Sequence, residues 1–334
     1  MSISYPSAKS EWTPLRLIES ELKLVEETLY ATLASPVGTI DAVTRHLVGA
    51  GGKRLRPSLV ILSAYASDKP VDIDTMIKLA AGVELIHMAT LVHDDVIDGA
   101  EIRRGRPTAN THWGNHVSVL TGDYMLAKSF FLLSGHGDMR IMQAVAQATI
   151  AMAEGEINQI EAVHDFRTQT DQYISTIKNK TAEFMSACCR IGAILASTPN
   201  EIENALADYG LNLGIAFQIT DDILDLAGDP ARTGKPIGGD LREGKLTLPV
   251  IITMMRASST DRIAIEKILS DSNNSMEDVE FVLRLAQQLG AIEEASLVAS
   301  DFIKTAVSSL QQLPASDARD SLEQLAHNIL HRDH

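Results

Sequence analysis

The stretch LVHDDVIDGAEIRRGRP, from Leu91 to Pro107, ends an apolar helical pattern with a histidine and three aspartates. Two arginines, Arg103 and Arg104, follow within a few residues. Buried carboxylates are costly unless they are paired with cations or bind a metal ion. The stretch therefore predicts a long helix that ends at an ionic site.

The same acidic pattern, D-D-x-x-D, occurs a second time in FQITDDILD, at residues 221–225. In a helix, the first and last aspartates of such a motif lie one turn apart on one face, and the middle one is rotated by about 100°. Two carboxylates in this position suit Mg²⁺, which keeps further sites for water or phosphate oxygens. The alternative for either motif alone is a solvated acidic helix end, but the repetition favours metal. The candidate metal ligands are Asp94, Asp95, Asp98, Asp221, Asp222 and Asp225.

The composition favours a helical protein with a full core. The chain has 334 residues, of which 45% are hydrophobic and only 4% aromatic, and sheets are usually richer in aromatic and β-branched residues. A net charge of −15 argues against binding to nucleic acid or anionic membranes. Any anionic ligand must then be held by local basic clusters or by metal ions.

Apolar residues recur at helical spacing along nearly the whole chain. We expect helices at about 14–34, 37–50, 57–67, 71–98, 112–134, 138–164, 170–196, 199–228, 246–256, 260–270, 276–290, 293–312 and 316–331. No linker divides them, so the prediction is one all-α domain over residues 1–334 without a membrane span. The segment 228–244 is long for a loop in a compact domain, and such loops often act as lids, although a plain surface loop is the alternative.

Basic residues gather beside glycines and after the first acidic motif. GGKRLRP, at residues 51–57, lacks the Ser or Thr that follows the lysine in a nucleotide-binding P-loop. Arginine side chains match phosphate oxygens bidentately, and lysine adds a mobile charge. Metal at the aspartates with these cations nearby describes a site for two diphosphate groups.

The chain resembles the trans-prenyltransferases, or polyprenyl diphosphate synthases, over nearly its whole length. The motifs that carry the resemblance are, in order, GGKRLRP, LVHDDVIDGAEIRRGRPT, GEI, KT, FQITDDILD and GKPIGGD. The resemblance implies the all-α isoprenoid synthase fold, a homodimer, three Mg²⁺ ions, and elongation of an allylic diphosphate by isopentenyl diphosphate. ELIHMATLVHDDVID is similar to the long-chain members, including the larger subunit of heptaprenyl diphosphate synthase.

The resemblance also assigns roles residue by residue. It implies that Asp94 and Asp98 bind two of the metal ions and Asp221 the third, with Asp225 nearby. The isopentenyl diphosphate would be held by Lys53, Arg56, His87 and Arg104. The allylic diphosphate or its reacting end would be held by Arg103, Lys180, Thr181, Gln218 and Lys235, with Lys245 as a weaker addition. The catalytic set is then Asp94, Asp98, Lys180, Thr181, Gln218 and Asp221.

The residues before the first motif bear on product length. Ile86, Ala89 and Thr90 precede Asp94 on the same helix, where the growing tail would run. Short-chain members often carry a bulky aromatic at the positions of Ala89 and Thr90, and several have an insertion in the motif that is absent here. We therefore expect a product of about seven to ten isoprene units. Phe130, Phe131 and Met142 are candidates for the tunnel floor.

Three smaller features complete the picture. The adjacent Cys188 and Cys189 are read as buried thiols in a reducing compartment, with a reactive dithiol as the alternative. The N-terminal residues show no basic-then-apolar signal pattern, so a cytoplasmic enzyme is expected. His112 and His116 have a spacing that suits zinc, but no third ligand is evident.

Four alternatives remain. A terpene cyclase would share the fold and the first motif, but the second D-D-x-x-D and the GGKRLRP cluster argue against it. A regulatory subunit would lose metal aspartates, whereas both motifs are complete here. A short-chain farnesyl or geranylgeranyl diphosphate synthase remains open, as does the catalytic half of a heterodimer that needs a small partner subunit.

Overall fold

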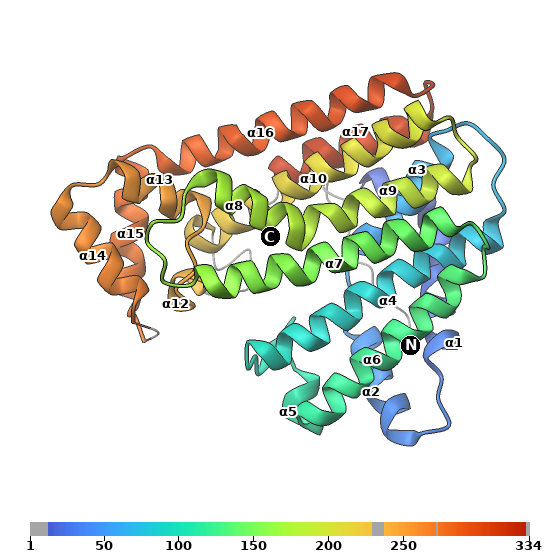
Figure 1. The fold of residues 1–334 in the computed structure, drawn as a ribbon, viewed down its shortest axis with the longest axis horizontal. Coiled ribbons are helices and arrows are strands. Elements are labelled where there is room, and N and C mark those ends of the chain that lie inside the picture. The colour runs from blue at the N-terminus through green and yellow to red at the C-terminus, as the bar shows by residue number, and fades with distance from the viewer. Residues whose placement is uncertain (1–12, 229–236, 272, 332–334) are drawn as a thin grey trace.

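Long helices packed side by side make up nearly the whole structure (Figure 1), a computed structural model that describes residues 13–228, 237–271 and 273–331. The first half comprises η1 (Thr13–Ile18), α1 (Glu19–Leu33), α2 (Gly38–Gly49), α3 (Leu55–Tyr65), α4 (Ile73–Ile97), the strands β1 (Ile102–Arg103) and β2 (Arg106–Pro107), α5 (Ala109–Trp113), α6 (Asn115–Ser134) and α7 (Met139–Ala162). The second half comprises α8 (Thr170–Ile177), the π-helical turn η2 (Lys178–Ala182), α9 (Glu183–Leu195), α10 (Asn200–Ala227), α12 (Gly239–Arg242), α13 (Leu248–Arg256), α14 (Ser259–Leu269), α15 (Met276–Gln288), α16 (Ala291–Ser309), η3 (Leu310–Gln312) and α17 (Asp317–Leu330).

The helices expected from the apolar period are confirmed, with local corrections; the first turns of the one expected at 14–34 and the last turn of the one expected at 293–312 are 3-10 helix. The helix expected at 112–134 is two helices, because Gly114 at the break has a φ of 80°. The helix expected at 170–196 contains the π-helical turn. A short antiparallel hairpin, β1–β2, follows α4. The segment 228–244 is not all loop, since it contains α12; its residues 229–236 lie outside the described part of the chain.

Several helices begin at the polar residues that favour an N-terminal cap. Asp72 accepts a hydrogen bond from the backbone N–H of Thr75 at the start of α4. Ser275 and Asp278 form a reciprocal capping box at the start of α15. These local signals place the helix starts within a residue or two of the positions that the apolar pattern predicts.

The helix α4 runs through the centre of the core. Except near its ends, where Ile73 and Ile97 are exposed, its apolar residues are buried on all sides, and its sequence is apolar over the length that a membrane span would need. Most of this stretch is buried inside the protein, as is usual for a core helix of a bundle. The polar exceptions, Glu84 and the aspartates of the first motif, are therefore the informative residues of α4.

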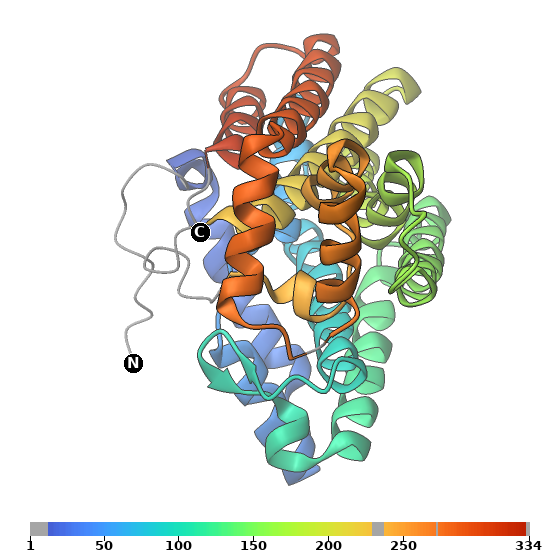
Figure 2. The ribbon, with the colours of Figure 1, turned by 90° about the vertical axis from the view of Figure 1, so that its left-hand side faces the viewer.

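Two clusters of buried side chains hold the helices together. The first joins α1–α4, α6, α7, α9, α10, α16 and α17, and the second joins α8, α10 and α12–α16, so α10 and α16 belong to both. Figure 2 shows α13, α14 and α15 covering one end of the bundle. The helices α4 and α10, which carry the two acidic motifs, both finish toward this end (Figure 1). The fold thus brings the two motifs to one end of the molecule.

Candidate active site

The second acidic motif lies on the last turns of α10, and its middle aspartate is the most enclosed. Asp222 is buried, and its two oxygens accept hydrogen bonds from the Tyr173 hydroxyl at 2.6 Å and from the Gln218 Nε2 atom at 2.8 Å. Burial raises the pKa of Asp222 to about 7, and these two hydrogen bonds oppose the shift. Asp222 therefore orients Gln218, whose amide faces the next feature.

The π-helical turn presents Lys180 and Thr181 to this site. Such turns are rare and occur often at functional sites. The Thr181 hydroxyl donates to Oε1 of Gln218 at 3.1 Å. The turn packs closely on α7, since a Cβ on Gly155 would come within 2.6 Å of the backbone nitrogen of Lys180. The GEI motif therefore needs its glycine here, and the following residue, Glu156, lies beside Lys180.

Lys180 connects this turn electrostatically to the first motif. Its Nζ atom forms an ion pair with Glu156 Oε2 at 2.6 Å and a hydrogen bond with Gln159. Burial, with Glu156 nearby, raises the pKa of Asp94 to about 6, and Lys180 opposes the shift. A buried carboxyl without a matching counter-ion has a raised pKa, so the surroundings of Asp94 favour the binding of a cation.

In the first motif the middle aspartate is again the buried one. Asp95 accepts a hydrogen bond from Arg103 Nε at 2.6 Å, which fixes an arginine of the β1 strand against the end of α4. Asp98 is exposed at the end of the helix, and Asp94 is half-buried one turn earlier. Within the described residues, neither Asp94 nor Asp98 forms an ion pair or side-chain hydrogen bond with the protein. The outer pair on one face is thus available to an external ligand.

Asp225, the last aspartate of the second motif, holds the short helix α12. Its two carboxylate oxygens accept hydrogen bonds from the backbone N–H groups of Gly239 at 3.1 Å and Asp240 at 3.0 Å. Burial would lower the pKa of Lys245, but the ion pair with Glu243 and the carboxylates of Asp240 and Asp98 raise it. Lys245 therefore lies within electrostatic reach of Asp98 on α4 and of Asp240 beside the second motif.

A basic pocket lies beside the first motif, between the ends of α2 and α3, the middle of α4 and the β-hairpin. Its lining includes His87, Arg103 and Arg104, together with Gly51, Arg54 and Glu84. Burial and the four surrounding arginines lower the pKa of His87 well below its usual value, so the ring is neutral. Arg56 follows Arg54 at the start of α3, and its guanidinium lies 5.6 Å from the centre of the Phe184 ring.

The structure thus gathers the predicted residues into two neighbouring groups, one around the acidic motifs and one in the basic pocket. Lys235 lies outside the described residues. Ile86 and Ala89 are fully buried on α4, and Thr90 is partly buried. The suggested floor residue Phe131 is wrong for a tunnel inside one chain, because its side chain is 76% exposed.

Other sequence features have ordinary structural roles. Cys188 and Cys189 are buried thiols, and burial raises the pKa of Cys189 to about 12, which disfavours a reactive dithiol. The ring of His112 packs against those of His46 and Trp113, at centroid distances of 5.7 and 5.2 Å. Within the described residues, no three His, Cys, Asp or Glu side chains are already arranged as a metal cluster.

Sequence reasoning did not assign Glu156, Tyr173, Arg54 or Glu84. Tyr173 and Asp222 are 49 residues apart, so no local pattern links them. Glu156 stands in the GEI motif, and a glutamate after a glycine in an apolar helix was the available signal. Glu84 was visible as a lone acid within the apolar α4 pattern, one turn before His87.

Comparison with known proteins identifies the family. The polyprenyl synthetase family model matches residues 37–286. The chain belongs to the polyprenyl synthetase family. It is 36% identical over 317 residues, 95% of this chain and 97% of the relative, to heptaprenyl diphosphate synthase component 2 of Geobacillus stearothermophilus. It is also 36% identical, over 89% of this chain and 91% of the relative, to a short chain isoprenyl diphosphate synthase of Methanothermobacter thermautotrophicus.

Solved structures agree with this membership. A polyprenyl synthase from Caulobacter crescentus, complexed with calcium and isoprenyl diphosphate, superimposes with a TM-score of 0.92 at 36% identity, covering 99% of this chain and all of that one. The expected isoprenoid synthase fold and the assignment as a prenyltransferase are therefore confirmed. The polyprenyl synthetases similar to this one make products of different lengths, so membership alone leaves the length open.

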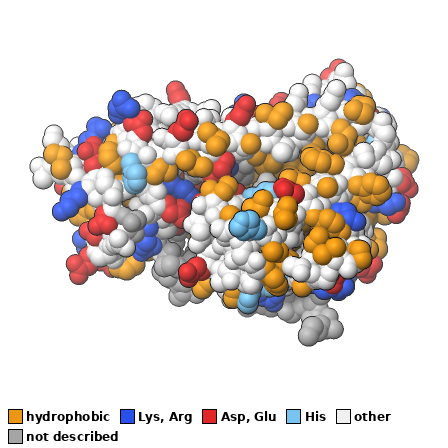
Figure 3. All heavy atoms as spheres, turned by 60° about the horizontal axis from the view of Figure 1, so that its bottom comes forward, with side chains coloured by type: hydrophobic (Ala, Val, Ile, Leu, Met, Phe, Trp, Pro, Cys, Tyr) orange, Lys and Arg blue, Asp and Glu red, His pale blue; other side chains and the backbone are white. Residues whose placement is uncertain are grey.

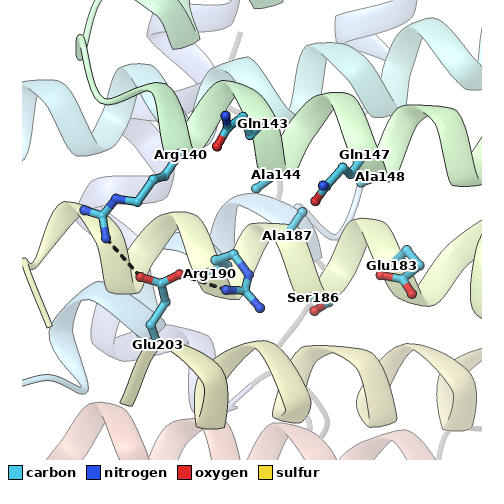
Figure 4. Close-up of a pocket in the computed structure, with 10 residues that line it drawn as sticks. All are labelled: Arg140, Gln143, Ala144, Gln147, Ala148, Glu183, Ser186, Ala187, Arg190 and Glu203. Atoms are coloured by element: carbon cyan, nitrogen blue, oxygen red, sulfur yellow. Dashed lines mark hydrogen bonds and ion pairs between the residues drawn. The ribbon is translucent and has the colours of Figure 1, made fainter. Parts of the chain in front are cut away.

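A second hollow lies away from this site, between α7, α9 and α10 (Figure 4). It measures about 350 Å³ and has a polar lining in which Arg140 and Arg190 both turn toward Glu203. The Nη1 atoms of the two arginines lie 3.2 and 2.8 Å from the carboxylate oxygens of Glu203. None of the predicted site residues lines this groove, and the charges of Arg140, Arg190 and Glu203 are mutually paired.

Proposed function

We propose that this prenyltransferase is a Mg²⁺-dependent enzyme that extends an allylic diphosphate with isopentenyl diphosphate to a long-chain polyprenyl diphosphate of about seven to ten isoprene units. The observation that carries the proposal is the basic pocket of His87, Arg103 and Arg104 directly beside the first motif, whose middle aspartate, Asp95, lines it. The basic pocket suits the diphosphate of one substrate, and the aspartates suit a metal-bound diphosphate of the other.

The donor set fits a hard divalent cation. Asp94 and Asp98 supply carboxylate oxygens one turn apart, and Asp221 supplies another from α10. The raised pKa of Asp94 supports an excess of negative charge that a cation would neutralise. We infer three Mg²⁺ ions with both motifs engaged, and the Caulobacter relative's calcium agrees with a divalent-metal requirement. When bound, such ions withdraw charge from the leaving diphosphate.

The remaining steps are assigned to residues of this chain. Lys53, Arg56, His87 and Arg104 hold the isopentenyl diphosphate, and Arg103, Lys180 and Lys235 hold the allylic diphosphate, with Lys245 as a further contact. Breaking the allylic C–O bond leaves a carbocation, and the oxygens of Thr181 and Gln218 stabilise it. The double bond of isopentenyl diphosphate then attacks, and a proton passes to the departing diphosphate. The closely packed apolar helices exclude water that would quench the cation.

The small residues before the first motif support a long product. The side chains of Ala89 and Thr90 on α4 are small, whereas a bulky aromatic side chain there would block the growing isoprenoid tail. Ile86 lies one turn earlier on the same helix. A short-chain product is the alternative, because a short-chain relative is equally similar to this chain. Of the three floor candidates, Phe131 is 76% exposed and Phe130 is 39% exposed, whereas Met142 is partly buried against the core, which favours Met142.

The exposed apolar surface supports a homodimer. Met139, Ala146, Ile150, Ala153, Ile157 and Ile160 on α7 are exposed and alternate at spacings of three, four and seven residues. This spacing is typical of a helix that packs against another helix. On α6, Leu120 and Phe131 are 67% and 76% exposed. Figure 3 shows apolar side chains gathered on the face that comes forward from the lower side of Figure 1, where α6 lies. We name these residues of α6 and α7 the apolar stripe.

The alternative partner is a small regulatory subunit, since the Geobacillus relative is named as one component of a synthase. We favour the homodimer because this chain contains both complete acidic motifs. The buried free thiols fit a reducing compartment, and we propose a cytoplasmic enzyme.

The function is tested by turnover of farnesyl diphosphate with and without isopentenyl diphosphate. We expect release of diphosphate only when both substrates and Mg²⁺ are present. Asp94→Asn should lower kcat about a thousandfold, whereas Asp301→Asn, an exposed aspartate of α16, should leave it unchanged. Diphosphate release from farnesyl diphosphate alone, with a hydrocarbon product, would instead identify a terpene cyclase.

A further inference from the structure

Arg54 is the arginine of the basic pocket that points into the protein. Only 6% of it is exposed, whereas 38% of the Arg103 side chain is. Its Nε atom pairs with Glu26 of α1, and its Nη1 atom lies 2.8 Å from Oε1 of Glu84 on α4. An arginine enclosed by two carboxylates is poorly placed to bind a diphosphate directly. Its position indicates a supporting role.

The backbone around this arginine is held in an unusual conformation. Arg54 and Arg104 have φ values of 49° and 52°, in the left-handed region that non-glycine residues rarely adopt. Such conformations persist only where the surroundings enforce them, and they concentrate at functional sites. Both arginines of this pair flank the same loop, Gly51–Gly52, just before Lys53.

The loop is held between the two guanidinium groups. Arg104 Nη1 donates to the carbonyl oxygen of Gly51. A Cβ on Gly52 would come within 2.8 Å of Arg104 Nη1 and 3.2 Å of Arg54 Nη1, so the backbone passes directly beside both charges. Arg54 thus fixes one side of the loop that carries Lys53, and the start of α3 that carries Arg56.

Glu84 ties this arrangement to the catalytic helix. It is buried on α4, one turn before His87, and its charge also stabilises the protonated forms of Arg56 and Arg104. Within the described residues, three buried polar atoms here have no hydrogen-bond partner: Oε2 of Glu84, Nη2 of Arg54 and Nε of Arg56. Unpaired buried charged groups are costly, and they indicate a site arranged in advance for a charged ligand.

We propose that Glu84 and Glu26, acting through Arg54, are positioning residues for isopentenyl diphosphate. They hold the 51–53 loop and the start of α3 against α4, so that Lys53, Arg56 and Arg104 converge on one diphosphate. This inference rests on the proposed function and deepens it, because it concerns the binding of one of the two substrates and not the other.

The test compares Glu84→Ala, Glu84→Gln and Glu26→Ala with Glu203→Ala. Glu203 is the matched control because it is also a buried glutamate of an arginine triad, but it lies in the separate groove of Figure 4. For each protein we would measure kcat, the KM of isopentenyl diphosphate, the KM of farnesyl diphosphate, and Tm. Titration calorimetry would give the Kd of isopentenyl diphosphate alone.

We expect Glu84→Ala to raise the KM and Kd of isopentenyl diphosphate about tenfold or more, with the KM of farnesyl diphosphate within about twofold. Glu84→Gln keeps an acceptor for Arg54 Nη1 and should recover most of the affinity. Glu203→Ala should lower Tm without changing either KM. Should Glu84→Ala fail to fold, Glu26→Ala provides the same comparison and should raise only the isopentenyl diphosphate constants.

The positioning role would be overturned by any of three results. These are equal increases in both KM values, an unchanged Kd of isopentenyl diphosphate in both alanine variants, or the same rise in the isopentenyl diphosphate constants in Glu203→Ala. Failure of the proposed function would be visible separately, as a wild-type protein that does not condense the two substrates. In that case the inference about isopentenyl diphosphate falls with it.

Discussion

Gln218 donates from Nε2 to Oδ1 of Asp222 at 2.8 Å, and its own Oε1 receives the hydroxyl of Thr181. An aspartate of the second acidic motif thereby sets the direction of the Gln218 amide dipole beside Thr181. The two D-D-x-x-D motifs share one feature: the middle aspartate, Asp95 or Asp222, is buried and accepts a hydrogen bond from a side chain of the protein.

Asp222→Asn should lower kcat about 10- to 100-fold, because the asparagine offers one acceptor and one donor where two acceptors stand now. To pair with the asparagine, the amide of Gln218 would rotate by about 180° and would present its N–H groups, not its oxygen, toward the carbocation. The KM values should change little. Steady-state kinetics checks this, with Tyr173→Phe as the milder control, since it removes one donor and leaves the Gln218 contact. An unchanged kcat in Asp222→Asn would show that orientation of Gln218 by Asp222 does not matter for turnover.

Metal should stabilise the protein more at high pH than at low pH. Burial raises the pKa of Asp94 to about 6 and that of Asp222 to about 7. A carboxyl whose pKa is raised in the folded protein contributes its full stabilisation when the pH is below the pKa of the unfolded chain, near 4. This stabilisation is lost as the pH rises through the pKa of the folded protein. The metal-free protein therefore carries uncompensated charge at pH 8, and Mg²⁺ would neutralise it.

The measurement is the increase in Tm on adding Mg²⁺, which should be larger at about pH 8 than at about pH 6. Asp94→Asn should reduce the difference between the two pH values. An increase in Tm that is the same at both pH values would show that these carboxyls do not respond to the metal.

Ala89→Phe should shorten the product to about four isoprene units while keeping turnover within a few-fold. Ala89 is fully buried on α4, five residues before Asp94, so a phenyl ring there would enter the space assigned to the tail. Reversed-phase sizing of the dephosphorylated products checks this. Ala89→Ser is the matched control and should leave the length unchanged. If the phenylalanine variant makes the wild-type product, Ala89 does not line the tail tunnel.

If the proposed homodimer forms through the apolar stripe, Ile150→Glu on α7 should convert it to a monomer of 36.2 kDa. A charge at the centre of a helix–helix interface is costly to bury. Light scattering after size exclusion measures the mass. Ile263→Glu is the control, since Ile263 is 67% exposed on α14, away from the stripe, and should leave the dimer intact. A wild-type monomer would instead favour the need for a partner subunit.

The apolar period gave the long helices because each has a continuous buried face, and capping residues such as Asp72 and Ser275 marked where they begin. The short elements were missed for a physical reason. The hairpin at 102–107 and α12 each contain only a few residues, so they have no period to detect. They are held by contacts distant in sequence, such as Asp225 with Gly239 and Asp240.

The site could be predicted where its chemistry is repeated or clustered in sequence, as in the two acidic motifs and GGKRLRP. It could not be predicted where one functional side chain orients another across the bundle. Tyr173 meets Asp222, and Arg54 meets both Glu26 and Glu84, only after the helices pack. The exposure of Phe131 likewise follows from the direction in which α6 packs, which its composition does not reveal.

The most direct test of the account is to incubate the purified chain alone with Mg²⁺, farnesyl diphosphate and labelled isopentenyl diphosphate, and to size the dephosphorylated products. We predict a ladder that ends at one dominant length of about seven to ten isoprene units, made without any partner. Products that stop at about three or four units would contradict the long-chain assignment. An inactive protein that condenses the substrates only after a second subunit is added would contradict the self-sufficient homodimer.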